Sequence, residues 1–112
     1  MTSEKFIAFM EKLLDCTKTE EIQWDRMRIN QNLGDQSKCF SCSTGNMEIY
    51  LITPTHDPEA KFIRISYDPK IPFSDLKPKN EDEKVILLRL FNYVYSLFPN
   101  LETAIDKFLN DF

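Results

Sequence analysis

Two cysteines, Cys39 and Cys42, form a C-x-x-C motif within the stretch K-C-F-S-C-S-T at residues 38 to 44. The same spacing occurs in zinc knuckles and in redox-active cysteine pairs, and both need a chain turn that brings the two sulfurs together. The turn-forming residues, Gly45 and Asn46, come only after this stretch. In a strand, side chains at these two cysteine positions point to opposite faces. We therefore expect Cys42 to be a small buried hydrophobic residue and Cys39 to be a surface or partly exposed thiol.

Few other residues could complete a metal or catalytic site with these cysteines. Cys16 lies at the end of the first expected helix, and the single histidine, His56, lies in the stretch T-H-D-P. A closed zinc site would need all four residues, and a Cys-His nucleophile pair would need a proximity that nothing in the sequence indicates. We expect His56 and Asp57 to form an exposed turn. The sequence therefore predicts no catalytic residue, no metal ligand and no cofactor.

The remaining polar features also have structural explanations. Asn80 and Glu83 match a capping box, and the acidic residues between them suit the positive end of a helix dipole. With only two glycines, the chain has no phosphate-binding loop, dinucleotide fingerprint or nucleophile elbow. These features favour a protein that is not an enzyme. The alternative is a small-ligand binding protein or minor enzyme with a pocket between sheet and helices, using Tyr50, His56 or Cys39.

The composition predicts one domain over residues 1–112. With 42% hydrophobic and 12% aromatic residues, the chain can close a single core without disulfides or metal. Its net charge of -4, with lysine and arginine scattered among acids, disfavours nucleic-acid binding. No stretch has the length of a membrane span, the N-terminus lacks a secretory signal, and three cysteines favour a reducing compartment. We expect a cytoplasmic protein that binds neither nucleic acid nor membrane.

Hydrophobic periodicity predicts the elements in the first third of the chain. Apolar residues at spacings of three and four predict a helix that begins at Ser3, as its cap, and ends near Thr17. Alternation around Ile22 and Trp24 predicts a short strand, with Trp24 as an anchor in the core. The polar stretch 29–37 predicts a loop.

The middle of the chain predicts an antiparallel sheet. Gly45 and Asn46 stand between two alternating runs, which is typical of a two-residue hairpin. One face of that hairpin then collects Phe40, Cys42, Met47, Ile49 and Leu51. Residues 62–67 alternate again and predict a third strand. The segment 68–79 contains three prolines, so we expect an ordered connection without regular structure.

The C-terminal third is the most apolar part of the chain. A helix from the cap at Asn80 to about Phe98 is apolar around nearly its whole circumference, which predicts burial on more than one side. Pro99 ends it, and Asn100 caps a last, amphipathic helix. The apolar residues of this helix are Leu101, Ala104, Ile105, Phe108, Leu109 and Phe112. The element order predicts an α+β fold with an N-terminal helix, an antiparallel meander of three to four strands, and two C-terminal helices packed on one sheet face.

Three helices compete for the single apolar face that such a sheet offers. Part of the C-terminal surface can therefore lack a partner within the chain. We expect a non-enzymatic interaction module that uses its C-terminal helices to bind a protein partner or a second copy in a homodimer. The candidate interface residues are Tyr93, Tyr95, Leu97, Phe108 and Phe112. The alternative is a long helix enclosed by the sheet, the last helix and the proline-rich connection.

Both ends of the chain resemble small stand-alone intracellular proteins of bacteria. The stretch L-L-D-C-T-K-T-E-E-I-Q-W at 13–24 looks like the amphipathic helix, threonine-rich break and I-x-W strand of such domains. The ending S-L-F-P-N-L-E-T-A-I-D-K-F-L-N-D-F at 96–112 is similar to their closing helices. The resemblance does not extend to the middle. It implies a stand-alone bacterial domain and brings no activity and no site residue to this chain.

Overall fold

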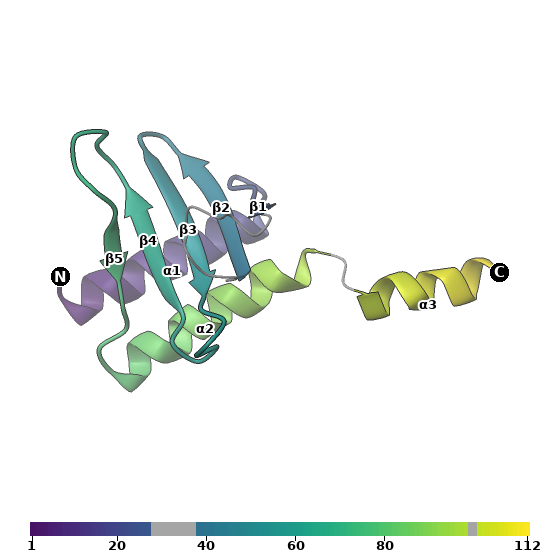
Figure 1. Ribbon diagram of the computed structural model, residues 1–112. Helices are drawn as coiled ribbons and strands as arrows, with labels where there is room; N and C mark the ends of the chain where they lie inside the picture. Colours follow the sequence, from purple (N-terminus) through teal and green to yellow (C-terminus); the bar gives the residue numbers. More distant parts are fainter. Residues whose placement is uncertain (28–37, 99–100) are drawn as a thin grey trace.

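A computed structural model of the chain describes residues 1–27, 38–98 and 101–112. The elements in chain order are α1 (Ser3–Lys18), β1 (Asp25–Met27), β2 (Lys38–Thr44), β3 (Met47–Thr53), β4 (Phe62–Ser66), β5 (Ser74–Leu76), α2 (Glu81–Ser96) and α3 (Leu101–Asp111). The five strands form one antiparallel sheet in sequence order, as Figure 1 shows. The predicted α+β class is therefore confirmed. The loop expected at 29–37 and the cap expected at Asn100 lie outside the described residues.

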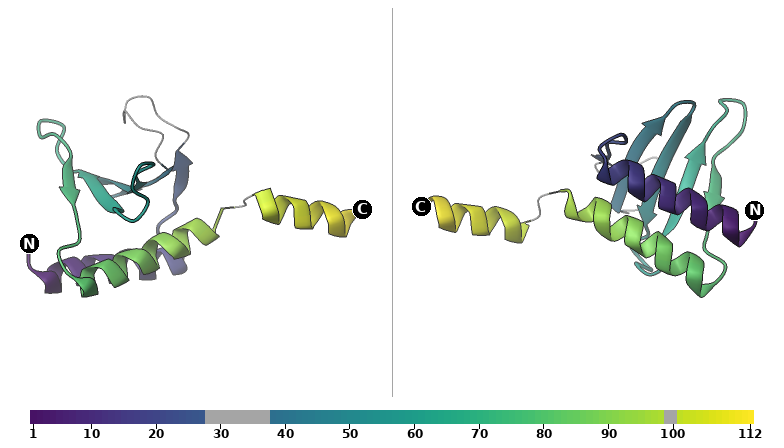
Figure 2. Two further views of the ribbon diagram at one scale, coloured as in Figure 1. Left: turned by 60° about the horizontal axis from the view of Figure 1, so that its bottom comes forward. Right: turned by 180° about the vertical axis from the view of Figure 1, so that it is seen from behind.

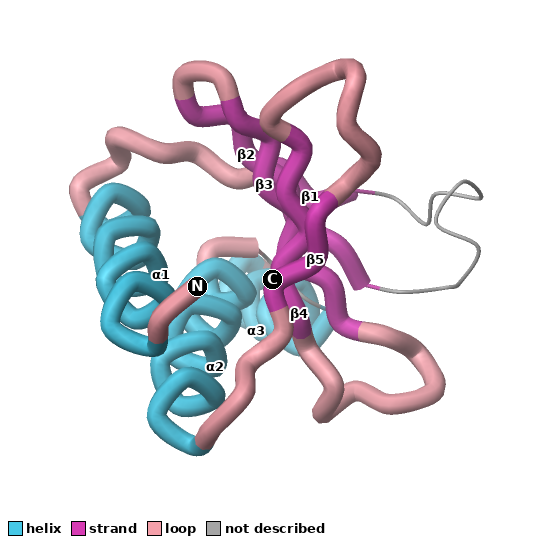
Figure 3. The backbone as a smooth tube through the Cα atoms, turned by 90° about the vertical axis from the view of Figure 1, so that its left-hand side faces the viewer, coloured by secondary structure: helices cyan, strands magenta, loops and turns pink. Residues whose placement is uncertain are grey.

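The core lies between the sheet and two helices. Figure 3 shows α1 and α2 side by side on one face of the sheet. Because alternate strand residues and every third or fourth helix residue share a face, each element turns one apolar side to this layer. The most deeply buried apolar residues are Met10 of α1, Ile49, Leu51 and Ile63 of the sheet, and Leu90 and Val94 of α2.

The central hairpin has the predicted register. Cys42 pairs with Ile49 and Phe40 with Leu51, and these four side chains are buried in the core. Gly45 has a φ of 55°, the positive value that a primed two-residue turn requires at its first central position. The turn chemistry and the alternation therefore agree, which confirms this prediction.

The first helix and the Trp24 segment differ in detail from expectation. The cap of α1 is Thr2 and not Ser3, because the Thr2 hydroxyl accepts from the backbone N–H of Lys5 at 3.2 Å. The strand expected around Ile22 and Trp24 begins only at Asp25. Trp24 is nevertheless buried in the core, which confirms its predicted role as an anchor.

Ser3 instead joins the N-terminal ends of the two helices. Glu83 forms one of the two hydrogen bonds of the predicted capping box, since its backbone N–H donates to Oδ1 of Asn80 at 3.0 Å. Its buried carboxylate accepts from the Ser3 hydroxyl at 2.5 Å and from Nδ2 of Asn80 at 2.7 Å. These hydrogen bonds fix the start of α1 against the start of α2.

The proline-rich segment contains a strand that its composition did not predict. β5 pairs with β4, placing Leu76 opposite Ile63 and Asp75 opposite Arg64. Pro72 and Pro78 lie outside the three residues that pair, so they do not interrupt the ladder. The meander consequently has five strands and not three to four.

The two C-terminal helices are less buried than expected. α2 buries only one side, and its residues Val85, Leu88 and Tyr95 are exposed, so the prediction of burial on more than one side is wrong. Every residue from Leu101 to Phe112 is exposed. Figures 1 and 2 show α3 beyond the C-terminal end of α2, away from the two layers. This differs from the expected packing of both C-terminal helices on the sheet. Within the described ranges, no helix has the length and apolar character needed to cross a bilayer.

Candidate interaction surface

The two cysteines of the C-x-x-C motif lie in β2 on opposite faces of the sheet. Cys42 belongs to the core between sheet and helices, whereas Cys39 is on the other face. Cys39 is only 2% exposed, so the expectation of a surface thiol is wrong. Burial raises the pKa of Cys39 to about 11 and the pKa of Cys42 to about 12. Both thiols are therefore protonated at neutral pH, which disfavours metal ligation and nucleophilic attack.

The other chemically reactive residues are dispersed. Over residues 1–27, 38–98 and 101–112, no three His, Cys, Asp or Glu side chains come together to hold a metal. His56 lies in the exposed loop between β3 and β4, where the backbone N–H of Ala60 donates to the carbonyl of Asp57 at 3.0 Å. The expected exposure of His56 and Asp57 is confirmed, but the hydrogen-bonded turn spans 57–60, so His56 lies just before it.

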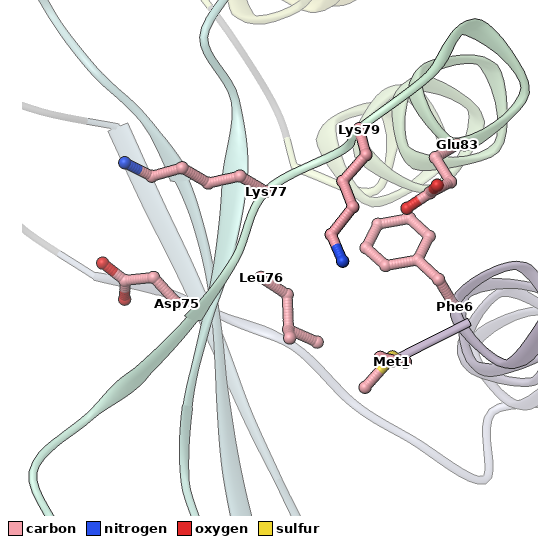
Figure 4. Close-up of a pocket in the computed structure, with 7 residues that line it drawn as sticks. All are labelled: Met1, Phe6, Asp75, Leu76, Lys77, Lys79 and Glu83. Atoms are coloured by element: carbon pink, nitrogen blue, oxygen red, sulfur yellow. The ribbon is translucent and has the colours of Figure 1, made fainter. Parts of the chain in front are cut away.

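Three of the hollows on the surface of the described residues bear on a ligand site. The smallest, about 170 Å³, lies where β5 meets the N-terminal ends of α1 and α2. Figure 4 shows Phe6, Leu76 and Lys79 converging on it. A second, about 450 Å³, is lined by Glu59, Lys61, Pro78, Glu81, Lys84, Leu87 and Leu88. The third, about 380 Å³, follows the loop from Ser66 to Phe73. The residues expected to serve an alternative ligand pocket, Cys39, Tyr50 and His56, line none of these three.

The outer face of the sheet carries a paired polar cluster. The guanidinium of Arg64 contacts both carboxylate oxygens of Asp75, at 2.7 and 3.1 Å, and lies 5.6 Å from the ring centroid of Phe73. The Tyr50 hydroxyl donates to Oε2 of Glu48 at 2.7 Å, and this hydrogen bond raises the pKa of Tyr50 to about 12. These polar groups form hydrogen bonds with one another. Stabilisation of the sheet is therefore enough to explain the cluster.

α2 carries a second, largely apolar stripe outside the core, and its last member, Tyr95, also packs edge-on against the core residue Phe40, with ring centroids 5.7 Å apart. The members of this α2 stripe are Val85, Leu88, Asn92 and Tyr95, which recur at spacings of three and four. All four are exposed, Leu88 to 47%. Lys84 and Arg89 border the stripe, and no acidic residue occurs between positions 84 and 95. The α2 stripe is therefore an apolar surface with a positively charged border.

α3 exposes the complete apolar side of an amphipathic helix. The members of this α3 face are Leu101, Ile105, Phe108, Leu109 and Phe112, and all are exposed, Phe108 to 60% and Phe112 to 94%. An isolated helix of this length is marginal in water, because nucleation is unfavourable and most helical stability comes from packing of an apolar face. The α3 face therefore needs a surface that covers it.

The candidate interface residues do not share one surface. Four of them are exposed: Tyr95, Leu97, Phe108 and Phe112. The fifth, Tyr93, is half-buried beside α1, and Nζ of Lys18 lies 5.6 Å from its ring centroid. Val85 and Leu88 of the α2 stripe were not among the candidates. Their spacing with Asn92 and Tyr95 indicates that the four share one side of α2, but the core-facing residues of the helix have the same spacing, so the pattern does not tell the two sides apart.

Comparison with known proteins gave no match, since no family model, no curated protein and no solved structure proved similar to this chain. The expected bacterial kinship stays a prediction.

Proposed function

We propose that this protein is a non-enzymatic protein-binding module and that α3 is its binding element. The observation that carries the proposal is the α3 face, five large apolar side chains that are all exposed on one helix. Surface patches of this kind on a folded protein are typical of interaction sites. The exposed α2 stripe adds a second apolar surface on the neighbouring helix.

The pattern on α3 suits recognition of a helix by a groove. Helices that bind in this way use anchors at spacings of three and four along one side. Leu101, Ile105, Phe108 and Phe112 have these spacings. Covering them would supply the packing that an eleven-residue helix needs to remain folded.

A ligand pocket or an active site has less support. Both C-x-x-C thiols are buried with raised pKa values, and His56 lies in a surface loop apart from the three hollows. The three cysteines are free thiols, which supports the proposal of a reducing compartment, the cytoplasm. The resemblance of the two chain ends adds bacterial origin to the same proposal.

A photo-crosslinking experiment tests whether α3 binds a protein. The photoreactive analogue benzoylphenylalanine replaces Phe108 in the full chain, and cells that produce the protein are irradiated. The matched control carries the analogue at Asn110, on the polar side of the same helix. We expect one discrete crosslinked product from position 108 and none from position 110. A folded chain that gives no product at position 108, or equal products at both positions, would overturn the proposal.

A further inference from the structure

The identity of the partner that covers the α3 face rests on the function proposed above. We infer that the partner is a second copy of this chain. Two copies pair about a two-fold axis, and α3 of each copy lies antiparallel on the α2 stripe of the other. Such an interface uses the same two surfaces twice, as closed dimers do.

The two surfaces match in length. At a rise of about 1.5 Å per residue, the α2 stripe from Val85 to Tyr95 spans about 15 Å, and the α3 face from Leu101 to Phe112 spans about 16 Å. In the antiparallel arrangement Leu101 therefore lies near the partner's Tyr95, and Phe112 near the partner's Val85.

Their charges are complementary. The segment 84–95 of α2 carries two positive residues, Lys84 and Arg89, and no acid, whereas the three residues before it, 81–83, are acidic. α3 carries three acids and one lysine, so it has an excess of negative charge. The antiparallel register places Asp111 of α3 near the partner's Lys84. Opposite charge at the border of an apolar contact favours this pairing and its direction.

A hollow is present where the end of α3 would dock. The hollow of about 450 Å³ lies at the N-terminal end of the α2 stripe, where the apolar residues Pro78, Leu87 and Leu88 line it together with the charged residues Glu59, Lys61, Glu81 and Lys84. In the antiparallel register this is the end that receives Phe112, the most exposed aromatic side chain of α3. The ring would contact the two leucines and the proline, and an aromatic ring seated in a pocket is a typical anchor of a protein interface.

The direction of α3 favours a second copy over the chain's own α2. Figures 1 and 2 show α3 continuing beyond the C-terminal end of α2, and the molecule is elongated, with extents of 52 × 30 × 28 Å. When the α2–α3 units of two copies lie antiparallel, the α3 of each copy meets the α2 of its partner. Neither chain then has to change its direction. Covering the chain's own α2 stripe would require α3 to reverse its direction.

The area available is sufficient for a stable dimer. A buried aromatic side chain contributes about 150–250 Å², so the exposed parts of Phe108 and Phe112 in both copies supply roughly 500 Å². The aliphatic residues of the two α3 faces and the two α2 stripes add to this. The total reaches the range above about 1,000 Å² that specific interfaces need.

A complementation experiment tests the reciprocal dimer. One full-length variant, Leu88→Glu, places a charge in the α2 stripe, and another, Phe108→Glu, places a charge in the α3 face. Both side chains are exposed in the single chain, so the fold tolerates either change. Asn110→Glu is the control on the polar side of α3. Sedimentation equilibrium over a concentration series gives the dissociation constant of each dimer.

We expect wild type and Asn110→Glu to dimerise with similar affinity, and each apolar-face variant to bind itself at least tenfold more weakly. An equimolar mixture of the two variants should associate more tightly than either alone, because one of the two contacts in the mixed dimer is native. Unchanged dimerisation in the variants, or a mixture no tighter than its components, would overturn the reciprocal arrangement.

The outcome also separates this inference from the proposed function. Suppose that the wild-type chain is monomeric at all concentrations and that position 108 crosslinks to a different protein. The inference of a second copy is then wrong, whereas the proposal of a binding module still holds. A monomer without any crosslink at position 108 would contradict both the inferred dimer and the proposed binding module.

Discussion

The rings of Phe108 and Phe112 pack against each other on α3, with centroids 4.9 Å apart and ring planes at 32°. Such a pair, four residues apart, stabilises an isolated helix by only about 0.2–0.5 kcal/mol. This contribution is too small to replace the burial that α3 lacks. The two rings instead form one continuous apolar surface, which suits α3 for contact with another chain.

Substitution of Phe108 should barely affect the stability of the single chain. Phe108→Glu should change the free energy of unfolding by less than about 0.5 kcal/mol, because the side chain is outside the core. Leu90→Ala, in contrast, should lower it by about 2–5 kcal/mol, since Leu90 is fully buried. Urea unfolding, followed by Trp24 fluorescence at a concentration where chains are separate, measures both. If Phe108→Glu lowered the free energy of unfolding by more than about 1 kcal/mol, α3 would have to pack against the rest of its own chain.

The hydrogen bond between Trp24 and Thr17 should contribute measurably to stability. The indole Nε1 donates to the Thr17 hydroxyl at 2.8 Å, and that hydroxyl donates to the carbonyl of Leu13 at 2.6 Å. Thr17→Val leaves the buried indole N–H without this acceptor and should cost about 1–3 kcal/mol. Thr17→Ser keeps the hydroxyl and should lose less. Equal losses in the two variants, measured by urea unfolding, would contradict this role of the hydroxyl.

Ser3 should stabilise the junction between α1 and α2. Glu83 is only 2% exposed, and Ser3 and Asn80 are the side-chain donors to its carboxylate. Ser3→Ala removes one donor from a buried charged group, so we expect a loss of about 1–3 kcal/mol. Glu4→Ala, an exposed substitution in the same turn of α1, is the control and should have little effect. Thermal unfolding of both variants at pH 7 measures the difference, and similar melting temperatures would contradict the prediction.

The buried thiols should be protected from reaction and should make stability depend on alkaline pH. Their folded-state pKa values, about 11 for Cys39 and about 12 for Cys42, lie above the ordinary value of 9.0. Their contribution to stability is therefore complete below pH 9 and decreases as the pH rises toward these folded values. At pH 8, a disulfide reagent that reacts with thiolates should label the partly exposed Cys16 first and the other two only on unfolding. Three thiols that react at one rate in the folded protein would contradict this.

Local signals predicted the hairpin and the cap of α2 because each depends on a few neighbouring residues. Gly45 supplies the positive φ of the turn, and the alternation on both sides determines which residues face the core. Asn80 caps α2 through the backbone N–H of Glu83, within one helical turn. Such features do not depend on distant parts of the chain.

The features that were missed depend on contacts between distant residues. β5 exists because β4 offers a free edge to Ser74–Leu76, a condition that proline content does not report. Alternation placed Cys39 on the outer face but could not indicate that this position is covered. In the same way, an apolar helix surface shows the same periodicity when it packs in its own core and when it binds another chain. The pattern alone could therefore not tell which sides of α2 and α3 are buried in the chain.

Amide hydrogen exchange in α3, measured on the purified full-length chain at several concentrations, tests the central claim most directly. In dilute solution the amides of Leu101–Asp111 should exchange almost as fast as in an unfolded chain, because an uncovered helix of this length is marginal. Their protection should rise with concentration as α3 becomes covered by a second copy. Protection that is the same at every concentration would show that α3 is covered by its own chain, and absence of protection even in concentrated solution would show that no second copy binds it.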